Sequence, residues 1–314
     1  MIGIGVDLGG TKMAVALVTA DGVVSHLMVE PTPARSGPAR VIADLVALVG
    51  RVRARAEQPV GWIGVAAAGA VDPATGTIVG ATDAISDWAG TRLAEALRRE
   101  LLLAESVPVI VNNDVDAHAI GESWMGAARL ATSLLMVTVG TGIGGAIVVD
   151  GVPRRGAHHR SGDIGHIPVA EAQGVRCSCG RLGHVEGVGS GPGLRRLYLA
   201  LGGNDRAVDA RAVVERARND DPIAVLAVAT SARAVGRAIA GAVATLDPLV
   251  VVVGGGLGLS GEPWWSAMEG SLRAELVDGL AGLQVMPSAL GDVSGVIGAS
   301  RAGFLSLGAE VMSR

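Results

Sequence analysis

Lysine and aromatic residues are the scarcest features of this sequence. Of the 26 basic residues only one, Lys12, is a lysine, and phenylalanine, tryptophan and tyrosine together make up 2% of the 314 residues. A nucleic-acid-binding protein needs a strongly basic surface and, for single strands, aromatic rings on which bases stack. Because the formal net charge is −4, the composition argues against a nucleic-acid partner and favours a mildly acidic enzyme.

Cysteine is also rare, and the best candidate for a membrane span is a poor one. The two cysteines, Cys177 and Cys179, stand one residue apart, too close for an ordinary disulfide, so they indicate a reducing compartment or a metal site. Residues 130–149 carry no charge but include four glycines and four serines or threonines, a composition typical of a strand, a loop and a second strand. With no basic and apolar leader visible, we expect a cytoplasmic protein that contacts no membrane.

A repeated pattern sets the expected architecture. An apolar strand, a glycine-rich corner, a second strand and an Asp-Gly turn occur over residues 2–22 and again over residues 134–151. Such self-similarity predicts two related domains, in keeping with a length of 314 residues and a usual domain size of about 150. We therefore expect two α/β domains whose glycine corners face one cleft.

The remaining segments alternate between helical and strand patterns. Helical spacing of apolar residues covers residues 38–57, 91–105, 193–201, 211–218 and 222–246, and apolar strands cover residues 60–67, 107–111 and 249–253. Residues 152–190 show no period, which indicates a long functional loop region. We place the N-terminal domain at residues 1–113 and the C-terminal domain at residues 114–295, and we expect a helix over residues 296–314 to complete the first domain.

The two glycine corners are candidate phosphate-binding sites. The spacing of Gly140, Gly142 and Gly145 fits G-x-G-x-x-G, but an apolar strand follows in place of the helix that a dinucleotide site requires. Glycine lets a phosphate approach the backbone and leaves amides free to bind it, although a plain tight turn explains either corner alone. Asp7 follows a buried strand, where a carboxylate needs a donor or a cation. Magnesium carried by nucleotide phosphates is one answer, and turn hydrogen bonds are another.

Two further groups of residues carry candidate chemistry. Asp114 follows an apolar strand and precedes a helical run, where it suits either a general base at the carboxyl end of the strand or a helix N-cap. His166, Cys177, Cys179 and His184 supply the thiolates and imidazoles of a tetrahedral zinc site. Two unrelated thiols and two loop histidines are the alternative.

At these motifs the sequence resembles the ROK family (repressors, unannotated reading frames and kinases) of sugar kinases, over nearly the whole chain. Residues 7–12 and 140–145 are similar to its two phosphate loops, Asn113-Asp114 with Gly121-Glu122 to its catalytic segment, and residues 165–166 and 177–186 to its signature stretch. The resemblance implies an actin-like ATPase fold of two ribonuclease-H-like domains. It also implies ATP, Mg²⁺, structural Zn²⁺ and a homo-oligomer, commonly a dimer.

The resemblance assigns a role to each candidate residue. Asp114 looks like the general base, and the substrate-binding set is Gly69, Asn113, Asp163, His166 and Glu186. The nucleotide-binding and phosphate-binding set is Asp7, Gly9, Gly10, Thr11, Lys12, Gly140, Thr141, Gly142, Gly254, Gly255 and Gly256. The metal-binding set is His166, Cys177, Cys179 and His184.

Three positions depart from the family's pattern, all on the sugar side. Asp163 stands where the family usually has glutamate, His184 replaces the third cysteine of its zinc set, and Ala84 stands where it often has asparagine. Shortening a side chain by one methylene moves a carboxylate by about an ångström, which alters the hydroxyl or amine that it meets.

The function that the resemblance implies is an ATP-dependent kinase that phosphorylates the 6-hydroxyl of glucose or a close relative. One alternative is a kinase for an aminohexose, such as kanosamine or N-acetylmannosamine, or for a cyclitol. The other is a non-catalytic sugar-sensing regulator. Regulators of this family place a winged helix-turn-helix before the kinase-like core, whereas here the core begins at residue 2, so we expect an enzyme.

Overall fold

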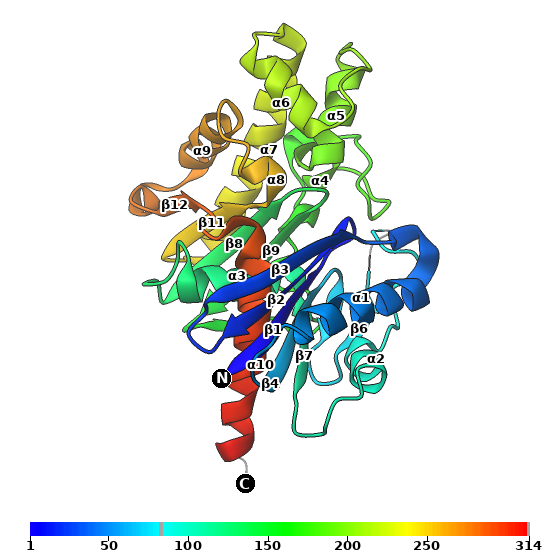
Figure 1. Ribbon diagram of the computed structural model, residues 1–314. Helices are drawn as coiled ribbons and strands as arrows, with labels where there is room; N and C mark the ends of the chain where they lie inside the picture. The colour runs from blue at the N-terminus through cyan, green and yellow to red at the C-terminus, as the bar shows by residue number, and fades with distance from the viewer. Residues whose placement is uncertain (82–83, 313–314) are drawn as a thin grey trace. The chain divides into compact units, whose positions relative to one another are not determined.

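The computed structural model describes residues 1–81 and 84–312, which form two compact units (Figure 1). Unit 1 contains Met1–Arg129, Gly151–Arg160 and the chain from Asp292 onwards. Unit 2 contains Leu130–Asp150 and Ser161–Gly291. The main boundary thus lies after residue 129 and not after residue 113 as predicted, and a short second segment, residues 151–160, returns to unit 1.

Unit 1 is built on a five-stranded mixed sheet of order β3-β2-β1-β4-β7. Its strands are β1 (Ile2–Leu8), β2 (Lys12–Thr19), β3 (Val24–Pro31), β4 (Val60–Ala67) and β7 (Val109–Asn113). The first three strands pair antiparallel, and β4 and β7 run parallel to β1. The first predicted hairpin is therefore the meander that opens this sheet.

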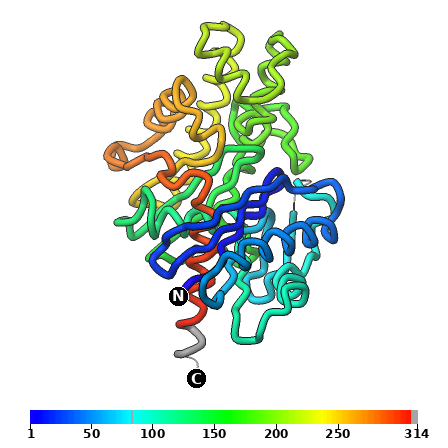
Figure 2. Tube along the Cα trace, in the orientation of Figure 1, coloured from blue at the N-terminus to red at the C-terminus, as the bar shows by residue number. Residues whose placement is uncertain are grey.

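The side-chain alternation of β1 decides what covers each face of the sheet. Ile4, Val6 and Leu8 lie in the core that includes buried residues of α1 (Gly37–Arg53). On the opposite face, a Cβ at Gly5 would stand 2.2 Å from the carbonyl oxygen of Val296 in α10 (Ser294–Met312). The C-terminal helix therefore packs directly on the backbone of the sheet (Figure 2). Asp7 belongs to this glycine-bearing face.

Helix α3 (Asp114–Met125) packs equally closely against α10. A Cβ at Gly298 would lie 1.7 Å from the carbonyl oxygen of Ala117, and one at Gly121 would lie 2.4 Å from that of Ser294. This contact holds α3 in unit 1, which explains the misplaced boundary. The predicted C-terminal helix does complete the first domain, although its residues 313–314 lie outside the described residues. The smaller elements are β5 (Ala70–Asp72), β6 (Thr77–Gly80), η1 (Ala34–Ser36), η5 (Gly291–Val293) and α2 (Leu93–Glu100).

Unit 2 repeats the sheet of unit 1, with strand order β9-β8-β11-β12 within the unit. The strands are β8 (Ser133–Val139), β9 (Ile143–Val149), β11 (Val250–Gly254) and β12 (Gln284–Pro287), whereas the short strand β10 (Val152–Pro153) lies in the segment that belongs to unit 1. Again a hairpin, β8–β9, adjoins two further strands that run parallel to its first strand. The repeat seen in the sequence is thus a duplicated sheet.

Helix α7 (Pro222–Leu246) forms the centre of the unit 2 core. It is long and apolar enough to cross a membrane by length and composition alone, but 61% of its most apolar window is buried inside the protein. A Cβ at Gly236 would lie 2.3 Å from the carbonyl oxygen of Met268 in α9 (Trp264–Glu275). Burial in this core accounts for its composition. The other elements are α4 (Glu186–Gly189), α5 (Gly191–Ala200), α6 (Ala210–Arg218), α8 (Gly255–Gly258), η2 (Ile164–His166), η3 (Ala170–Ala172) and η4 (Asp278–Leu280).

Several predicted elements have different ends in the structure. The helix predicted over residues 38–57 ends at Arg53, and two other differences have a clear local reason. The helix predicted over residues 91–105 ends at Glu100, because Leu102 adopts a left-handed backbone with φ of 49°. The strand predicted from residue 107 begins only after Pro108, which has no N–H to donate to a sheet. Between residues 152 and 190 there are only short elements, as predicted.

Candidate active site

The first glycine corner connects β1 and β2 in unit 1. The Gly9 amide donates to the Lys12 carbonyl oxygen at 3.0 Å, and the Thr32 hydroxyl donates to the Gly9 carbonyl oxygen at 2.7 Å. Thr11 and Lys12 are exposed, and a Cβ at Gly10 would meet Ala84 at 3.0 Å. The Lys12 ammonium lies 2.9 Å from Asp292 Oδ1 in an ion pair open to solvent, with side chains 45% and 88% exposed.

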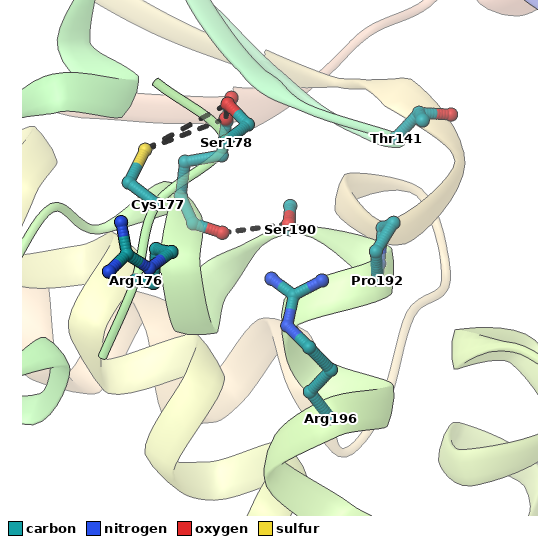
Figure 3. Close-up of a pocket in the computed structure, with 8 residues that line it drawn as sticks. Thr141, Arg176, Cys177, Ser178, Ser190, Pro192 and Arg196 are labelled. Carbon is teal, nitrogen blue, oxygen red and sulfur yellow. Dashed lines mark hydrogen bonds between the residues drawn. The ribbon is translucent and has the colours of Figure 1, made fainter. Parts of the chain in front are cut away.

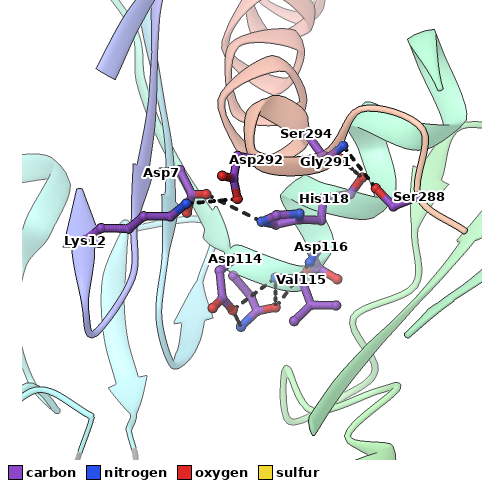
Figure 4. A network of polar contacts seen from close by, with 11 residues as sticks. Asp7, Lys12, Asp114, Val115, Asp116, His118, Ser288, Gly291, Asp292 and Ser294 are labelled. Carbon is purple, nitrogen blue, oxygen red and sulfur yellow. Dashed lines mark hydrogen bonds and ion pairs between the residues drawn. The ribbon is translucent and has the colours of Figure 1, made fainter. Parts of the chain in front are cut away.

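Asp7 lies at the end of β1 beside a histidine that the sequence reasoning missed. His118 Nε2 is 3.5 Å from Asp7 Oδ2 (Figure 4). His118 is four residues after Asp114 on α3, so both side chains share one helix face. A Cβ at Gly295 would stand 2.7 Å from Asp7 Oδ2 and 3.0 Å from His118 Nε2, so only glycine fits there. The i, i+4 spacing from Asp114 was the available sequence signal.

Asp114 is the first residue of α3, and its neighbour caps the helix. The Asn113 side-chain oxygen accepts from the amides of Val115 and Asp116 at 2.9 and 3.2 Å. The Asn113 amide nitrogen donates to the Gly69 carbonyl oxygen at 2.8 Å and to Asp114 Oδ1 at 2.9 Å. Asn113 is therefore the N-cap, which leaves the Asp114 carboxylate oriented by Asn113 and available for other chemistry.

Burial raises the pKa of Asp114 to about 6, and the charge of Asp7 adds to this effect while His118 opposes it. Burial alone lowers the pKa of His118, but its ion pair with Asp7 and the charge of Asp114 outweigh burial and raise that pKa. A carboxylate with a pKa near 6 is largely ionised at neutral pH and accepts a proton more readily than an ordinary one. The electrostatics suit a general base.

A second half-buried ion pair, also missed from the sequence, supports the start of α3. Arg155 Nε lies 3.3 Å from Asp116 Oδ2, and Arg155 Nη2 donates to Asn112 Oδ1 at 2.6 Å. Burial raises the pKa of Asp116, and the Arg155 charge opposes that shift. This pair fixes the turn of chain that carries Asp114.

The second glycine corner connects β8 and β9 in unit 2. The Gly140 amide donates to the Gly142 carbonyl oxygen at 2.9 Å. Gly255 has φ of +81°, and a Cβ there would stand 2.5 Å from the Val139 carbonyl oxygen. A Cβ at Gly140 would lie 3.9 Å from the Gly256 nitrogen. The corner, with exposed Thr141 at its tip, and the turn of residues 254–256 therefore lie next to each other.

The predicted metal-binding residues come together in unit 2. One ligand atom from each of His166, Cys177, Cys179 and His184 can be chosen so that all four lie within 4.8 Å of one another. Cys177 Sγ is 3.6 Å from His166 Nδ1, and Cys179 Sγ is 3.2 Å from His184 Nδ1. Tetrahedral zinc with bonds of about 2.0–2.3 Å places its ligands about 3.3–3.8 Å apart. Both cysteines are free thiols, so the donor set and its spacing suit a tetrahedral metal ion.

Two other predicted substrate-binding residues, Asp163 and Glu186, lie near this cluster. With His166 Nδ1 turned toward Cys177, His166 Nε2 lies 3.8 Å from Asp163 Oδ1. Glu186 is 9% exposed, and its Oε2 accepts from the Ile143 amide at 2.9 Å. A pocket of about 390 Å³ opens beside it (Figure 3). Its lining includes Thr141, Arg176, Ser178, Glu186, Ser190 and Arg196.

The chain matches the family model described as "ROK family" over residues 3–302. This protein belongs to the ROK family. It is 32% identical to a glucokinase from Thermotoga maritima, over 92% of this chain and 89% of that protein. It is 33% identical to a kanosamine kinase from Amycolatopsis mediterranei, over 97% of each chain. The crystal structure of a ROK family glucokinase from Streptomyces griseus with glucose and AMPPNP superposes with a TM-score of 0.82, at 29% identity over 96% of this chain and 99% of that one.

Membership of the ROK family confirms the predicted α/β class and the actin-like ATPase fold. The structure also places the three departures from the ROK pattern. His184 takes part in the Cys/His cluster although it replaces a cysteine, Asp163 lies beside His166, and Ala84 lies against the first glycine corner.

Proposed function

We propose that this ROK protein is an ATP-dependent hexose kinase that transfers the γ-phosphate to the 6-hydroxyl of glucose or a close relative. The observation that carries the proposal is Asp114, a carboxylate held by Asn113 at the start of α3 with its pKa raised to about 6. A base for a sugar hydroxyl needs this combination of fixed geometry and raised proton affinity. The similarity to glucokinases over most of the chain supports glucose as the acceptor.

In this mechanism Asp114 accepts the proton of the attacking hydroxyl as the oxygen bonds to the γ-phosphorus and ADP leaves. The backbone amides of the two glycine corners hold the donor phosphates, and the turn of residues 254–256 holds the adenosine. Asn113, Asp163, His166 and Glu186, with the Gly69 backbone, hold the other sugar hydroxyls. Transition-state charge is stabilised mainly by donors that are already in place before the reaction.

Asp7 is the residue that suits magnesium, because its carboxylate ends a buried strand and oxygen is the ligand that this ion prefers. When bound with the nucleotide, the ion neutralises charge on the phosphates. His118, through its contact with Asp7, holds the carboxylate oriented for this purpose.

We propose zinc as the metal of the Cys/His cluster, with His166, Cys177, Cys179 and His184 as ligands. Two thiolates and two imidazoles in a compact group are a zinc donor set. The ion supplies a structural cross-link when bound and no chemistry on the substrate. His166 is fixed by the cluster through Nδ1, which leaves Nε2 for the sugar.

A second candidate acceptor is an aminohexose, and Asp163 favours it. Its carboxylate lies 3.8 Å from His166 Nε2, where a protonated amine on the sugar gains a counter-charge that neutral glucose does not use. The identity of 33% to a kanosamine kinase supports this alternative. A sugar-sensing regulator remains the alternative without catalysis.

A coupled ADP-release assay tests these candidates. Wild-type protein is assayed with glucose, mannose, fructose, N-acetylmannosamine and 3-amino-3-deoxyglucose, with an exposed-site variant, Asp278→Asn, as the control for handling. A kcat/KM that is highest for glucose supports the first proposal, and one highest for the 3-amino sugar supports the second. Sugar binding without ADP release from any sugar contradicts a kinase and supports the regulator.

We further propose a homodimer in the cytoplasm. Light scattering should then give twice the chain mass of 31.5 kDa.

A further inference from the structure

The Glu186 carboxylate is held at both oxygens by two different segments of unit 2. Oε1 accepts a hydrogen bond from the Ser178 hydroxyl, and Oε2 accepts from the Ile143 amide at 2.9 Å. Ser178 lies between the two cysteines of the metal cluster, whereas Ile143 follows the glycine corner directly. The carboxylate therefore connects the Cys/His loop with the β8–β9 corner.

The surroundings of Glu186 leave the side chain little freedom. A Cβ at Gly142 would stand 2.8 Å from Oε2, so the carboxylate lies against the corner backbone. The Glu186 carbonyl oxygen accepts from the Ser190 hydroxyl at 2.7 Å, which fixes the backbone beneath the side chain. Of these contacts, only the one from Ser178 comes from an exposed side chain that can be removed without opening the core.

We propose that Ser178 is a positioning residue whose hydroxyl, together with the Ile143 amide, holds the Glu186 carboxylate in the orientation that binds an acceptor hydroxyl. The inference rests on the proposed function, in which Glu186 contacts the sugar. Each carboxylate oxygen can accept two hydrogen bonds. Oε1 also accepts from the Cys177 thiol at 3.8 Å, but a thiolate bound to the metal has no proton to donate, so in the metal-loaded protein the second acceptor position of each oxygen remains for the substrate. Orientation fixed before binding lowers the entropy cost of the sugar contact.

The proposal predicts a specific kinetic signature. Glu186 holds hydroxyls that do not react, so its contacts are equal in the ground state and the transition state. Loss of such a contact raises KM and leaves kcat unchanged. Because the bond from Ser178 to Glu186 is charge-assisted but partly replaceable by water, we expect Ser178→Ala to raise the KM for the sugar about 5- to 20-fold. The KM for MgATP and kcat should stay within about twofold.

The test compares four proteins in the zinc-loaded state: wild type, Ser178→Ala, Ser178→Thr and Ser271→Ala. Threonine retains the hydroxyl and should restore the KM for the sugar. Ser271 is the control, because it is a half-buried serine outside the candidate site whose hydroxyl likewise donates a hydrogen bond, to the Arg233 carbonyl oxygen at 3.0 Å. Zinc content by elemental analysis should be equal in all four. A panel of monodeoxyglucoses should contain one sugar whose KM is insensitive to Ser178→Ala, namely the sugar that lacks the hydroxyl bound by Glu186.

Three results overturn the inference. An unchanged sugar KM in Ser178→Ala, in an active enzyme whose Glu186→Gln variant has a raised sugar KM, removes the role of Ser178 and leaves the proposed function intact. Loss of zinc in Ser178→Ala shows that the serine acts on the metal loop and not on Glu186. A wild-type protein that phosphorylates no sugar overturns the proposed function itself, and the inference with it.

Discussion

The sheets of the two units share their topology, but only unit 1 places ionisable side chains at the carboxyl ends of its mutually parallel strands, β1, β4 and β7. Asp7 is the second-last residue of β1, and Asp114 follows the last residue of β7. At the equivalent position of β8 unit 2 has Thr138, and β12 ends at Pro287. The glycine corner is therefore the duplicated feature, whereas the carboxylates at the strand ends belong to one copy. Under the proposed function, the shared element binds phosphate and the unshared element supplies the base.

The residues that hold the candidate carboxylates in place also differ between the two units. In unit 1, Asp7 is paired with His118, a titratable side chain whose charge also acts on Asp114. In unit 2, Glu186 is held by a hydroxyl and a backbone amide, which are neutral. The pH dependence of the enzyme should therefore arise in unit 1, and its sugar affinity should depend on the neutral contacts of unit 2.

The largest effect should come from Asp114→Asn, which removes the proposed general base in unit 1. We expect kcat to fall about 10³-fold in the coupled assay, because a positioned base contributes about 10²- to 10⁴-fold. The same substitution should increase the stability of the fold at neutral and alkaline pH. The raised pKa of about 6 means that the carboxyl group stabilises the fold when protonated, and that this contribution is lost as pH rises from about 4 through 6.

Asp114→Asn should accordingly melt at a higher temperature than wild type at pH 8. The gain in the free energy of unfolding is at most about 3 kcal/mol, the equivalent of about two pKa units. Thermal denaturation at pH 4 and pH 8 measures the difference, which should vanish at pH 4. Near-normal turnover in this variant would contradict the assignment of the base, and a lower melting temperature at pH 8 would contradict the buried charge.

The next effect concerns the metal cluster, which only unit 2 contains among the residues that the structure describes. Cys177 is 3% exposed, and burial raises the pKa of its thiol. Cys177→Ser should abolish the binding of about one zinc ion per chain and lower the melting temperature by about 5–10 °C. Wild-type protein treated with a chelator should have the same melting temperature as the variant. A metal-free wild type with full activity and stability would show that the cluster needs no ion.

Alanine at one glycine of each corner then tests whether the two corners are equivalent. A Cβ at Gly9 would approach nothing closer than the Lys12 carbonyl oxygen at 3.4 Å, and one at Gly140 nothing closer than the Gly256 nitrogen at 3.9 Å. Both methyl groups fit the protein but obstruct a phosphate. Gly9→Ala and Gly140→Ala should each raise the KM for MgATP about tenfold, with stability changed by less than about 0.5 kcal/mol.

Gly241→Ala, in α7 with open space at its Cβ, is the matched control for these two variants. It should leave KM unchanged and increase stability by up to about 1 kcal/mol. If only the unit 2 variant impairs MgATP binding, the first corner is a plain tight turn, and the duplication is structural rather than functional.

The sequence predicted the features that local patterns determine and missed those that depend on packing between distant segments. The strand over residues 60–67 and the helix over residues 222–246 have their predicted ends, because apolar runs and an N-terminal proline are local signals. The position of α3 was missed because it depends on the close approach of Gly298 to Ala117. No local sequence pattern predicts a contact between residues so far apart in the chain.

The same distinction holds within the candidate site. The Cys/His quartet was predicted because three of its members lie within eight residues and are chemically distinctive. His118 and Arg155 were missed because each is significant only through its partner, Asp7 for the histidine and Asp116 for the arginine. The spacing of His118 from Asp114 was a signal that the two share a helix face, but nothing local indicated that Asp7 or Asp116 would be the partner.

His118→Gln tests the titratable support of unit 1, with a smaller expected effect. The charge of His118 lowers the pKa of Asp114 against the effects of burial and Asp7, so its loss should move that pKa upward. The acid limb of the kcat/KM profile should shift to higher pH by up to about one unit, which lowers kcat/KM at pH 6 about fivefold and leaves it nearly unchanged at pH 8. His158→Gln, at an exposed loop residue, should retain the wild-type profile. An acid limb that does not shift would show that the charge of His118 has no effect on the pKa of Asp114.

The smallest effect should come from Lys12, the one lysine of the chain. Its ion pair with Asp292 is exposed, and such pairs contribute at most about 1 kcal/mol to stability. Lys12→Met and Asp292→Asn should therefore melt within a few degrees of wild type. The KM for MgATP should distinguish the two variants. If Lys12 adds a cation to the first corner, Lys12→Met raises this KM about threefold, and by more at low salt. Asp292→Asn should leave the KM unchanged, or lower it because the Lys12 ammonium loses its partner. Equal KM values in both variants would mean that unit 1 binds phosphate through its backbone alone, as we propose for unit 2, which has no lysine at its corner.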